Sequence, residues 1–362
     1  MKSLVICCDG TWNRADSTTD AEQHNATNVL RFAYLTAKRD ADGNPQILFY
    51  DQGVGTGNRV DRLTGGAFGR GLDDNIFDAY RFLIANYEEG DRIYLVGFSR
   101  GAFTARSLAG LIRTCGILKR EAVDHYVEAL RRYREREGDP DSEELRAIRS
   151  GCSIAGDGKV PIHFIGVWDT VGSLGIPLRG LRGLTRRRYR FHDTELSGSV
   201  AHAYHALAID ERRAPFEPML WSSEPKGKQV LEQVWFAGVH SDVGGGYQER
   251  GNSDVSLGWM LEKAEAAGLA TDRSSPLRKL IAPQPLADLH DSKRGFYRVT
   301  PGIDRPIGLR PADPGEPKGA TVEDTRQSLH PSVRSRWDAD SSYRPPSLRE
   351  YFARTRDPRA TA

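Results

Sequence analysis

The sequence predicts an α/β fold in which a mainly parallel β-sheet is covered by helices on both faces. Short apolar runs typical of buried parallel strands alternate along the chain with segments whose apolar residues recur at helical spacing. The 362 residues are 38% hydrophobic and 28% charged, which is ordinary for a globular protein. The formal net charge is only +2, so the composition gives no reason to expect a nucleic-acid partner.

The first elements follow directly from this alternation. Leu4–Cys8 is an apolar run that ends at Asp9, and it predicts a short buried strand. Between residues 28 and 37 the apolar positions fall at helical spacing, which predicts a helix. Ile47–Tyr50 predicts the second strand. The loop Asp51–Asn58 has a G-x-G-x-G spacing rather than a phosphate-binding motif with its helix and lysine, so nucleotide binding is not expected.

The remaining elements continue the pattern. An amphipathic helix is expected over residues 76–87, and the apolar run 93–96 after it is the third strand. A second amphipathic pattern at 123–133 predicts another helix. Two β-rich runs, Ile162–Trp168 and Val234–Val239, predict the last strands, and each is followed by a turn.

One domain is expected over residues 1–300. The stretch 301–362 is rich in proline and arginine and poor in apolar positions, so we expect an irregular arm that packs on this domain. The N-terminal apolar run is too short for a signal peptide, and no run approaches the ~18–20 residues of a membrane span.

The four cysteines have neither the spacing of a disulfide framework nor that of metal ligands. Cys7 and Cys8 are neighbours in a strand, so their side chains are expected to point to opposite faces of the sheet. We therefore expect synthesis in the cytosol, with any export following a route that needs no signal peptide.

The segment Asp91–Ile112 carries the most specific motif. An apolar run meets Gly-Phe-Ser-Arg-Gly, and a helical pattern of small residues follows at once. This is the strand, sharp turn and helix of a nucleophile elbow, G-x-S-x-G, which indicates an α/β-hydrolase-like fold. Ser99 on so tight a turn is expected to have strained backbone geometry. Side chains at Gly97 or Gly101 would collide with the neighbouring strand or helix, which explains the two glycines.

Polar residues after two other strands complete a catalytic arrangement. In a parallel sheet the carboxyl ends of the strands meet at one edge, where ligands bind. Asp169 follows the strand 162–168, and His240 follows the last strand. The order Ser99, Asp169, His240 is the one expected of a hydrolytic triad in this fold. His240 would accept the proton of the serine, and Asp169 would orient the imidazole. Gly244–Gly246 is expected to form a loop that bends under a ligand.

An oxyanion hole is expected beside the serine. The backbone N–H of Arg100, which follows the serine directly, is one expected donor. The second donor is expected from Gly10 or Thr11, in the loop after the first strand. The helix that begins at the elbow would aim further N–H groups at the same place.

Other residues compete for the triad positions. Asp169 would otherwise cap a turn. Asp210, in the segment ALAIDERR, is the alternative acid, unless it pairs with Arg212 or Arg213. His330 is the alternative base, because hydrolase bases often lie late in the chain.

A cation is a further alternative near the site. Asp242 either stabilises the loop of His240 or holds a cation together with Asp9, although these two carboxylates have no recognisable metal-ligand spacing. The prediction is that the protein needs neither a metal nor a cofactor.

Six arginines lie between Arg179 and Arg190. Either they belong to a solvated loop or they form a cationic lip that attracts anionic headgroups, with about 1 kcal/mol for each arginine near the membrane surface. Such a peripheral membrane contact would be weak, because no long apolar anchor accompanies it.

Seven segments in order carry a family resemblance: CCDGTWN, TNVLR, YDQGVGTG, GFSRGAFTARSLAGLI, GVWDTVGSLG, ALAIDERR and GVHSDVGGGY. They resemble a large α/β-hydrolase family, long labelled a domain of unknown function, that includes the catalytic domain of the first class of type VI secretion phospholipase effectors. The likeness extends over residues 3–350. It implies a phospholipase or esterase whose nucleophile, acid and base fall on Ser99, Asp169 and His240.

Together these observations predict a serine ester hydrolase that works through an acyl-enzyme, with a phospholipid acyl ester as the preferred substrate. A small soluble carboxylic ester is the alternative substrate, because the phospholipase effectors carry extra segments without a counterpart in these 362 residues. A non-catalytic interaction module on the same fold is the alternative from a different functional class.

Overall fold

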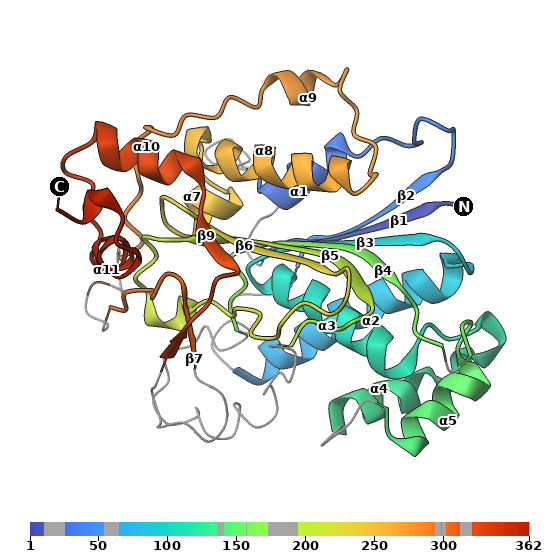
Figure 1. Ribbon diagram of the computed structural model, residues 1–362. Coiled ribbons are helices and arrows are strands. Elements are labelled where there is room, and N and C mark those ends of the chain that lie inside the picture. Colours follow the sequence, from blue (N-terminus) through green and yellow to red (C-terminus); the bar gives the residue numbers. More distant parts are fainter. Residues whose placement is uncertain are drawn as a thin grey trace.

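A computed structural model describes residues 1–10, 26–53, 65–135, 141–156, 158–172, 195–293, 298, 302–311 and 321–361. Within these ranges seven parallel strands form one sheet in the order β2-β1-β3-β4-β5-β6-β9, with helices above and below it (Figure 1). The protein therefore has the α/β-hydrolase-like fold that the sequence predicts.

The strands of this sheet are β1 (Ser3–Cys8), β2 (Gln46–Asp51), β3 (Arg92–Phe98), β4 (Ile162–Trp168), β5 (Val200–Ala208), β6 (Val230–Phe236) and β9 (Gln327–Leu329). A separate antiparallel pair consists of β7 (Leu309–Pro311) and β8 (Thr321–Glu323). The sequence patterns missed β5 and β9 of the main sheet, and also the pair β7 and β8. The run VAHAYHALA of β5 contains histidines and a tyrosine, and the three residues of β9 are too few to show a period.

The helices are α1 (Asn28–Leu35), α2 (Gly65–Asn86), α3 (Arg100–Cys115), α4 (Tyr126–Glu135), α5 (Glu143–Cys152), α7 (His240–Gly244), α8 (Gly251–Ala266), α9 (Pro276–Lys279), α10 (Pro331–Ala339) and α11 (Pro346–Thr355). Helices α1 and α8 cover one face of the sheet, and α2 and α3 cover the other (Figure 1). In the part of the chain that the structure describes, no helix is long and apolar enough to cross a membrane.

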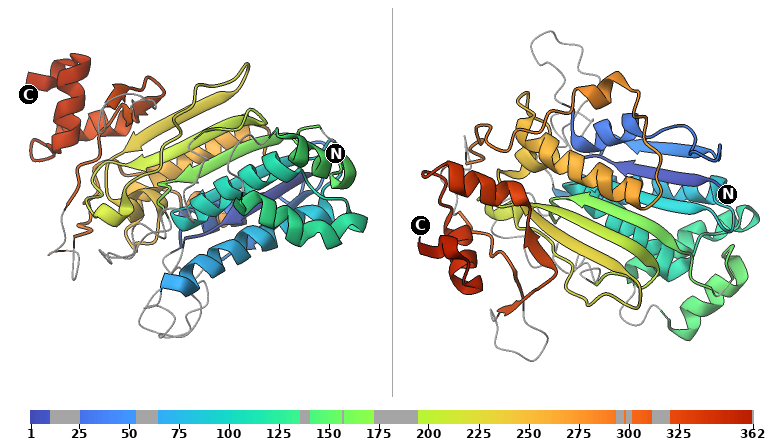
Figure 2. Two further views of the ribbon diagram at one scale, coloured as in Figure 1. Left: turned by 90° about the horizontal axis from the view of Figure 1, so that it is seen from below. Right: turned by 45° about the horizontal axis from the view of Figure 1, so that its top comes forward.

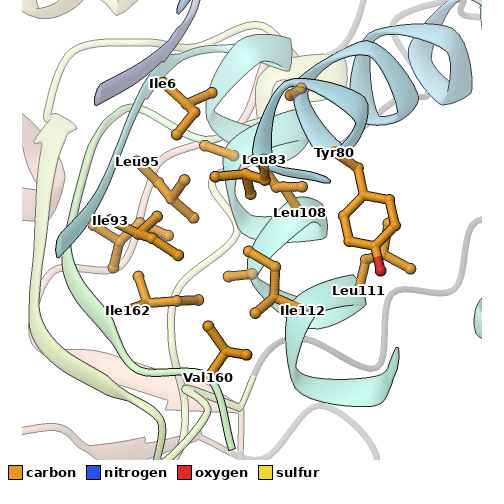
Figure 3. Close-up of a cluster of buried hydrophobic side chains, with 14 of the residues drawn as sticks. Ile6, Tyr80, Leu83, Ile93, Leu95, Leu108, Leu111, Ile112, Val160 and Ile162 are labelled. Carbon is orange, nitrogen blue, oxygen red and sulfur yellow. The ribbon is translucent and has the colours of Figure 1, made fainter. Parts of the chain in front are cut away.

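Each face of the sheet has its own hydrophobic core. Strand β1 alternates between them: Leu4, Ile6 and Cys8 pack on the α2 and α3 side, while Val5 and Cys7 pack on the α1 and α8 side. The prediction that the adjacent cysteines face opposite ways is thus confirmed. Figure 3 shows side chains of the first core from β1, β3, α2 and α3.

The C-terminal segment is not the irregular arm that the sequence predicts. It supplies β9, which extends the sheet beside β6, and the helices α10 and α11, which lie at that end of the sheet (Figure 2). A third core joins it to β5 and β6 through Trp337, Leu348, Phe352 and their neighbours. The prediction failed because these apolar residues are widely spaced among prolines and arginines, so that no period is visible.

Candidate active site

Ser99 lies between β3 and α3 in a strained backbone conformation, with φ of 58° and ψ of −118°. Positive φ is costly for a residue with a side chain, and such strain is typical of functional sites. The backbone N–H of Ser99 donates to the carbonyl oxygen of Trp168 at 3.0 Å, which fixes the turn against the end of β4. Only 7% of the serine is exposed.

The glycines on either side of the serine allow a very close approach of the backbone. A Cβ atom on Gly101 would lie 2.0 Å from the carbonyl oxygen of Cys8 and 2.5 Å from that of Asp9. A Cβ atom on Gly97 would lie 2.5 Å from the carbonyl oxygen of Gly101. The N-terminus of α3 can therefore rest directly on the end of β1, as the elbow motif requires.

Asp169 and His240 are hydrogen-bonded to each other. The imidazole Nδ1 donates to Oδ2 of Asp169 at 2.5 Å, and both side chains are buried. Burial alone would raise the pKa of the Asp169 carboxyl, but the charge of Arg305 and the bond from His240 outweigh it and hold this pKa well below its usual range. The carboxylate is therefore ionised at any pH at which the protein would work.

Two aromatic rings enclose the imidazole of His240. The ring of Phe98 lies 4.6 Å from it, and the ring of Phe216 meets it edge-on at 5.0 Å. Since Phe98 directly precedes Ser99, this packing brings His240 next to the elbow. The Ser99 side chain makes no capping hydrogen bond to the first turn of α3. Catalytic hydrogen bonds of a serine often form only when substrate is bound.

Glu211 holds the backbone of His240 and was not expected from the sequence. Its carboxylate accepts the His240 N–H at 3.3 Å and pairs with Arg213 at 2.8 Å. Burial would raise the pKa of Glu211, but the hydrogen bonds and charge of Arg213 outweigh it and lower this pKa. The signal was present in ALAIDERR, where a carboxylate and arginines follow an apolar run, but the prediction considered only the aspartate of that segment.

The glycines after His240 do not form the bendable loop that the sequence suggests. Gly244 ends α7, and a Cβ atom there would lie 2.0 Å from the ring of Phe98. Gly245 has φ of 81° and approaches the backbone of Thr27 and Asn28. Gly244 therefore allows tight packing of α7 against Phe98, and Gly245 allows the next turn to pack on the start of α1.

The competing acid and base have other partners. Asp210 accepts hydrogen bonds from the Gly238 N–H at 2.6 Å and from the Tyr343 hydroxyl at 3.0 Å. The suggested ion pair of Asp210 with an arginine is wrong: Arg213 pairs with Glu211, and Arg212 lies 3.8 Å from Asp304.

His330 caps helix α10. Its Nδ1 accepts from the Ser332 N–H at 3.3 Å, and its ring stacks on Phe236. Burial lowers the pKa of His330 to about 4.

The two carboxylates proposed to hold a cation are also engaged. Asp9 accepts from the hydroxyls of Thr27 and Tyr50, each at 2.6 Å. Asp242 accepts from Nδ1 of His290 at 2.7 Å. Within the described ranges no group of three or more His, Cys, Asp or Glu residues is arranged to hold a metal ion.

The expected oxyanion donors are only partly described. Arg100 is the first residue of α3, at the positive end of the helix dipole. The Gly10 N–H donates to Oδ1 of Asp9 at 2.6 Å, so that this bond would have to open before Gly10 could bind an oxyanion. Thr11 and the segment Arg179–Arg190 lie outside the described residues.

Arg305 is the second site residue that the sequence did not reveal. It comes from the C-terminal segment, is 1% exposed, and forms an ion pair with Asp169 at 2.7 Å. Nothing in its surroundings, GIDRPIG, distinguishes it from a solvated arginine.

Comparisons with known proteins identify the family. Residues 2–263 match the family described as the catalytic domain of Tle1-like phospholipase effectors of the type VI secretion system. An uncharacterized protein of Saccharomyces cerevisiae is 32% identical over 243 residues, which are 62% of this chain and 33% of the yeast protein. The chain thus spans about a third of the length of this curated relative.

Two solved structures are also similar. An uncharacterized protein from Pseudomonas aeruginosa has a TM-score of 0.47 and 16% identity, over 78% of this chain and 49% of that one. The Tle1 effector, solved in complex with the VgrG spike of a type VI secretion system, has a TM-score of 0.35 and 19% identity, over 68% of this chain and 51% of that one. Because the family match spans most of the sequence, the chain belongs to the family of Tle1-like phospholipase effector catalytic domains.

Proposed function

We propose that the protein is a phospholipase that cleaves an acyl ester through a Ser99-Asp169-His240 triad. Membership of the family supports a phospholipase or related ester hydrolase. The observation that carries the triad is the 2.5 Å hydrogen bond between Asp169 and His240, formed beside a serine with positive φ. An aspartate that fixes one imidazole nitrogen leaves the other nitrogen to act as a base.

The proposed reaction has two halves. Ser99 Oγ attacks the ester carbonyl carbon while Nε2 of His240 takes its proton, which gives a tetrahedral intermediate with a negative oxygen. The intermediate collapses to an acyl-enzyme, and His240 returns the proton to the departing alcohol. Water then attacks the acyl-enzyme with the same proton transfers and releases the carboxylic acid and free serine.

The start of α3 is suited to stabilise the negative oxygen of that intermediate. Backbone N–H groups of a first helical turn lack intrahelical partners, and the helix dipole adds positive potential there. The N–H of Arg100 directly follows the nucleophile and is the proposed first donor. Donors of this kind are each worth about 10²–10³-fold in kcat.

Labelling with a fluorophosphonate tests the nucleophile, because only an activated serine reacts. The parent protein should be labelled and should hydrolyse phospholipid vesicles. Ser99→Ala should lose labelling and keep only a residual rate of about 10³–10⁴-fold over water.

Ser107→Ala is a matched control. Ser107 is buried in the same helix and donates to the carbonyl oxygen of Phe103, without a part in the proposed triad. This variant should label like the parent.

The remaining outcomes separate the alternatives. Turnover of a soluble short-chain ester without any hydrolysis of vesicles would replace the phospholipase by a carboxylesterase. If the folded parent is not labelled and hydrolyses neither substrate, the proposal is refuted, and a non-catalytic interaction module becomes the interpretation.

A further inference from the structure

Arg305 makes an unusually complete set of contacts with the proposed triad acid. Its Nη1 donates to Oδ1 of Asp169 at 2.7 Å, and its Nη2 donates to Oδ2 at 3.1 Å, so the guanidinium spans both carboxylate oxygens. The same two nitrogens donate to the carbonyl oxygens of Ala208 at 2.7 Å and Phe216 at 2.5 Å. The side chains of Arg305 and Asp169 are both fully buried.

This geometry links three parts of the site. Ala208 ends β5, and its own N–H donates to Oδ1 of Asp169 at 3.1 Å. Phe216 carries the ring that meets the imidazole of His240. One planar guanidinium therefore contacts both oxygens of the acid and is itself held by the backbone at the end of β5 and at Phe216. A lysine could not reproduce this two-pronged contact.

The charge of Arg305 also acts on the base. In a triad, the carboxylate favours the imidazolium that forms when the histidine takes a proton. Here Oδ2 of Asp169 accepts from both Arg305 and His240, so the negative charge is shared with a permanent cation. The cation opposes formation of a second cation on the imidazole, because two like charges repel strongly where water is excluded.

In the described part of the chain, two further acidic residues near His240 each have a basic partner. Glu211 accepts the backbone N–H of His240 and is paired with Arg213. Asp242, on the same helix, is bonded to His290. Behind the acid, burial lowers the pKa of His205 to about 3, so this ring is neutral; its Nε2 accepts the N–H of Thr170, the residue after Asp169. Of the charged side chains that the structure describes, Asp169 is bonded directly to the imidazole, and Arg305 is bonded directly to Asp169.

We propose that Arg305 is a positioning residue of the triad, which fixes the Asp169 carboxylate through both of its oxygens and opposes the build-up of positive charge on the imidazole of His240. The inference rests on the proposed function for its kinetic meaning, but its electrostatic part is measurable in an inactive protein. It also assigns the segment after residue 300 a direct part in the site.

The first measurement compares Arg305→Met and Arg305→Lys with the parent on a soluble short-chain ester between pH 4 and 9. Loss of the cation in Arg305→Met should shift the acidic limb of the pH profile of kcat/KM to higher pH by about 1–2 units. Arg305→Lys keeps the positive charge but loses the contact with both carboxylate oxygens. The acidic limb of its pH profile should therefore stay within about 0.5 unit of the parent while kcat falls about tenfold.

Arg336→Met is the matched control. Arg336 is buried in α10, and its described contacts are with Ala287, Asn252 and Tyr343, none of which belongs to the proposed triad. The Arg336→Met variant should have a lower thermal stability than the parent, with the acidic limb of its pH profile of kcat/KM unchanged. A folded Arg305→Met variant with the limb of the parent would overturn the proposal.

A second measurement does not need activity. Titration of the His240 ring by NMR in the parent and in Arg305→Met should give a higher midpoint in the variant. If this midpoint rises but the parent does not hydrolyse esters, the electrostatic role stands and the proposed function fails. If the parent is active and the midpoint is unchanged, the proposal on Arg305 fails.

A double variant covers the case in which Arg305→Met does not fold. Asp169→Asn together with Arg305→Met removes both buried charges and should be more stable than either single variant, because neither charge is left unpaired. In the Asp169→Asn background, loss of Arg305 should lower kcat by less than twofold. A loss of tenfold or more there would mean that Arg305 does not act through Asp169 and would overturn the proposal.

Discussion

Substitution of Gly101 by alanine should disrupt the elbow far more than the loss of one hydrogen atom suggests. The added Cβ atom would lie 2.0 Å from the carbonyl oxygen of Cys8 and 2.5 Å from that of Asp9. Ordinary van der Waals contacts begin at 3.4 Å, so the 2.0 Å distance is far too short for two non-bonded atoms. The obstructing atoms belong to the backbone and cannot rotate away as a side chain would.

The magnitude follows from what must move. Strand β1 is hydrogen-bonded on both sides, to β2 and β3, so the N-terminus of α3 has to yield instead. Overpacking a core typically costs about 1–3 kcal/mol, and we expect about 3 kcal/mol or more here because the strand is held on both sides. A displacement of Ser99 by about 1 Å would also reduce kcat by about 10²-fold.

Gly258→Ala provides the matched comparison. Gly258 lies within α8, where an added Cβ atom has nothing within 4 Å. Alanine is the better helix former, so this variant should gain about 0.5–1 kcal/mol. Urea unfolding, followed by tryptophan fluorescence, measures the change in stability of both variants. The rate of hydrolysis of a soluble ester shows whether Ser99 is still placed for catalysis. If Gly101→Ala kept the urea midpoint and the rate of the parent, the reasoning about the elbow would be wrong.

Three further predictions concern residues around the site. His330→Ala should lose about 1 kcal/mol of stability with the helix cap but retain more than half of the esterase rate, and a loss comparable to that of Ser99→Ala would make it the base instead. Burial raises the pKa of Asp210 to about 6, so the folded protein binds this proton more tightly than the unfolded chain and loses stability as pH rises from about 4 through 6. Asp210→Asn should then be about 1–3 kcal/mol more stable than the parent at pH 8 and nearly equal to it at pH 4, by urea unfolding at both values. Glutamine at Arg186, Arg187 and Arg188 should weaken binding to anionic vesicles at low salt and leave soluble-ester hydrolysis unchanged, whereas undiminished vesicle binding would exclude the cationic lip.

The central part of the fold was predictable because buried parallel strands consist of continuous runs of apolar residues. Strands β1, β3 and β4 have this form, and each was expected within a few residues of its observed bounds. Strand β5 is equally buried, but its polar residues find partners that only the folded protein supplies. His205 accepts the N–H of Thr170, and Tyr204 packs against Trp259. Local sequence contains no sign of such compensation.

In the candidate site, too, some residues could be predicted from local sequence and others only from the folded structure. Ser99, Asp169 and His240 each follow a strand, so their convergence at one edge of the sheet could be inferred from order alone. The geometry joins Asp169 to His240 and packs the ring of Phe98, the residue before Ser99, against the imidazole. The catalytic roles of the three residues stay predictions until labelling and kinetics test them. The tight packing of Gly244 was not predicted, because a glycine a few residues after a histidine occurs both in loops that bend and in crowded contacts, and the sequence does not distinguish the two.

Arg305 could not be predicted from the sequence for an electrostatic reason. A carboxylate as deeply buried as Asp169 loses its hydration, and the ionised form that a triad needs would be disfavoured without compensation. The hydrogen bond from His240 supplies part of that compensation, and the cation supplies another part. The cation can come from anywhere in the chain that reaches the site, because only its final position matters. A buried acid at the end of a strand therefore predicts that a basic partner exists, and only the folded structure identifies it as Arg305.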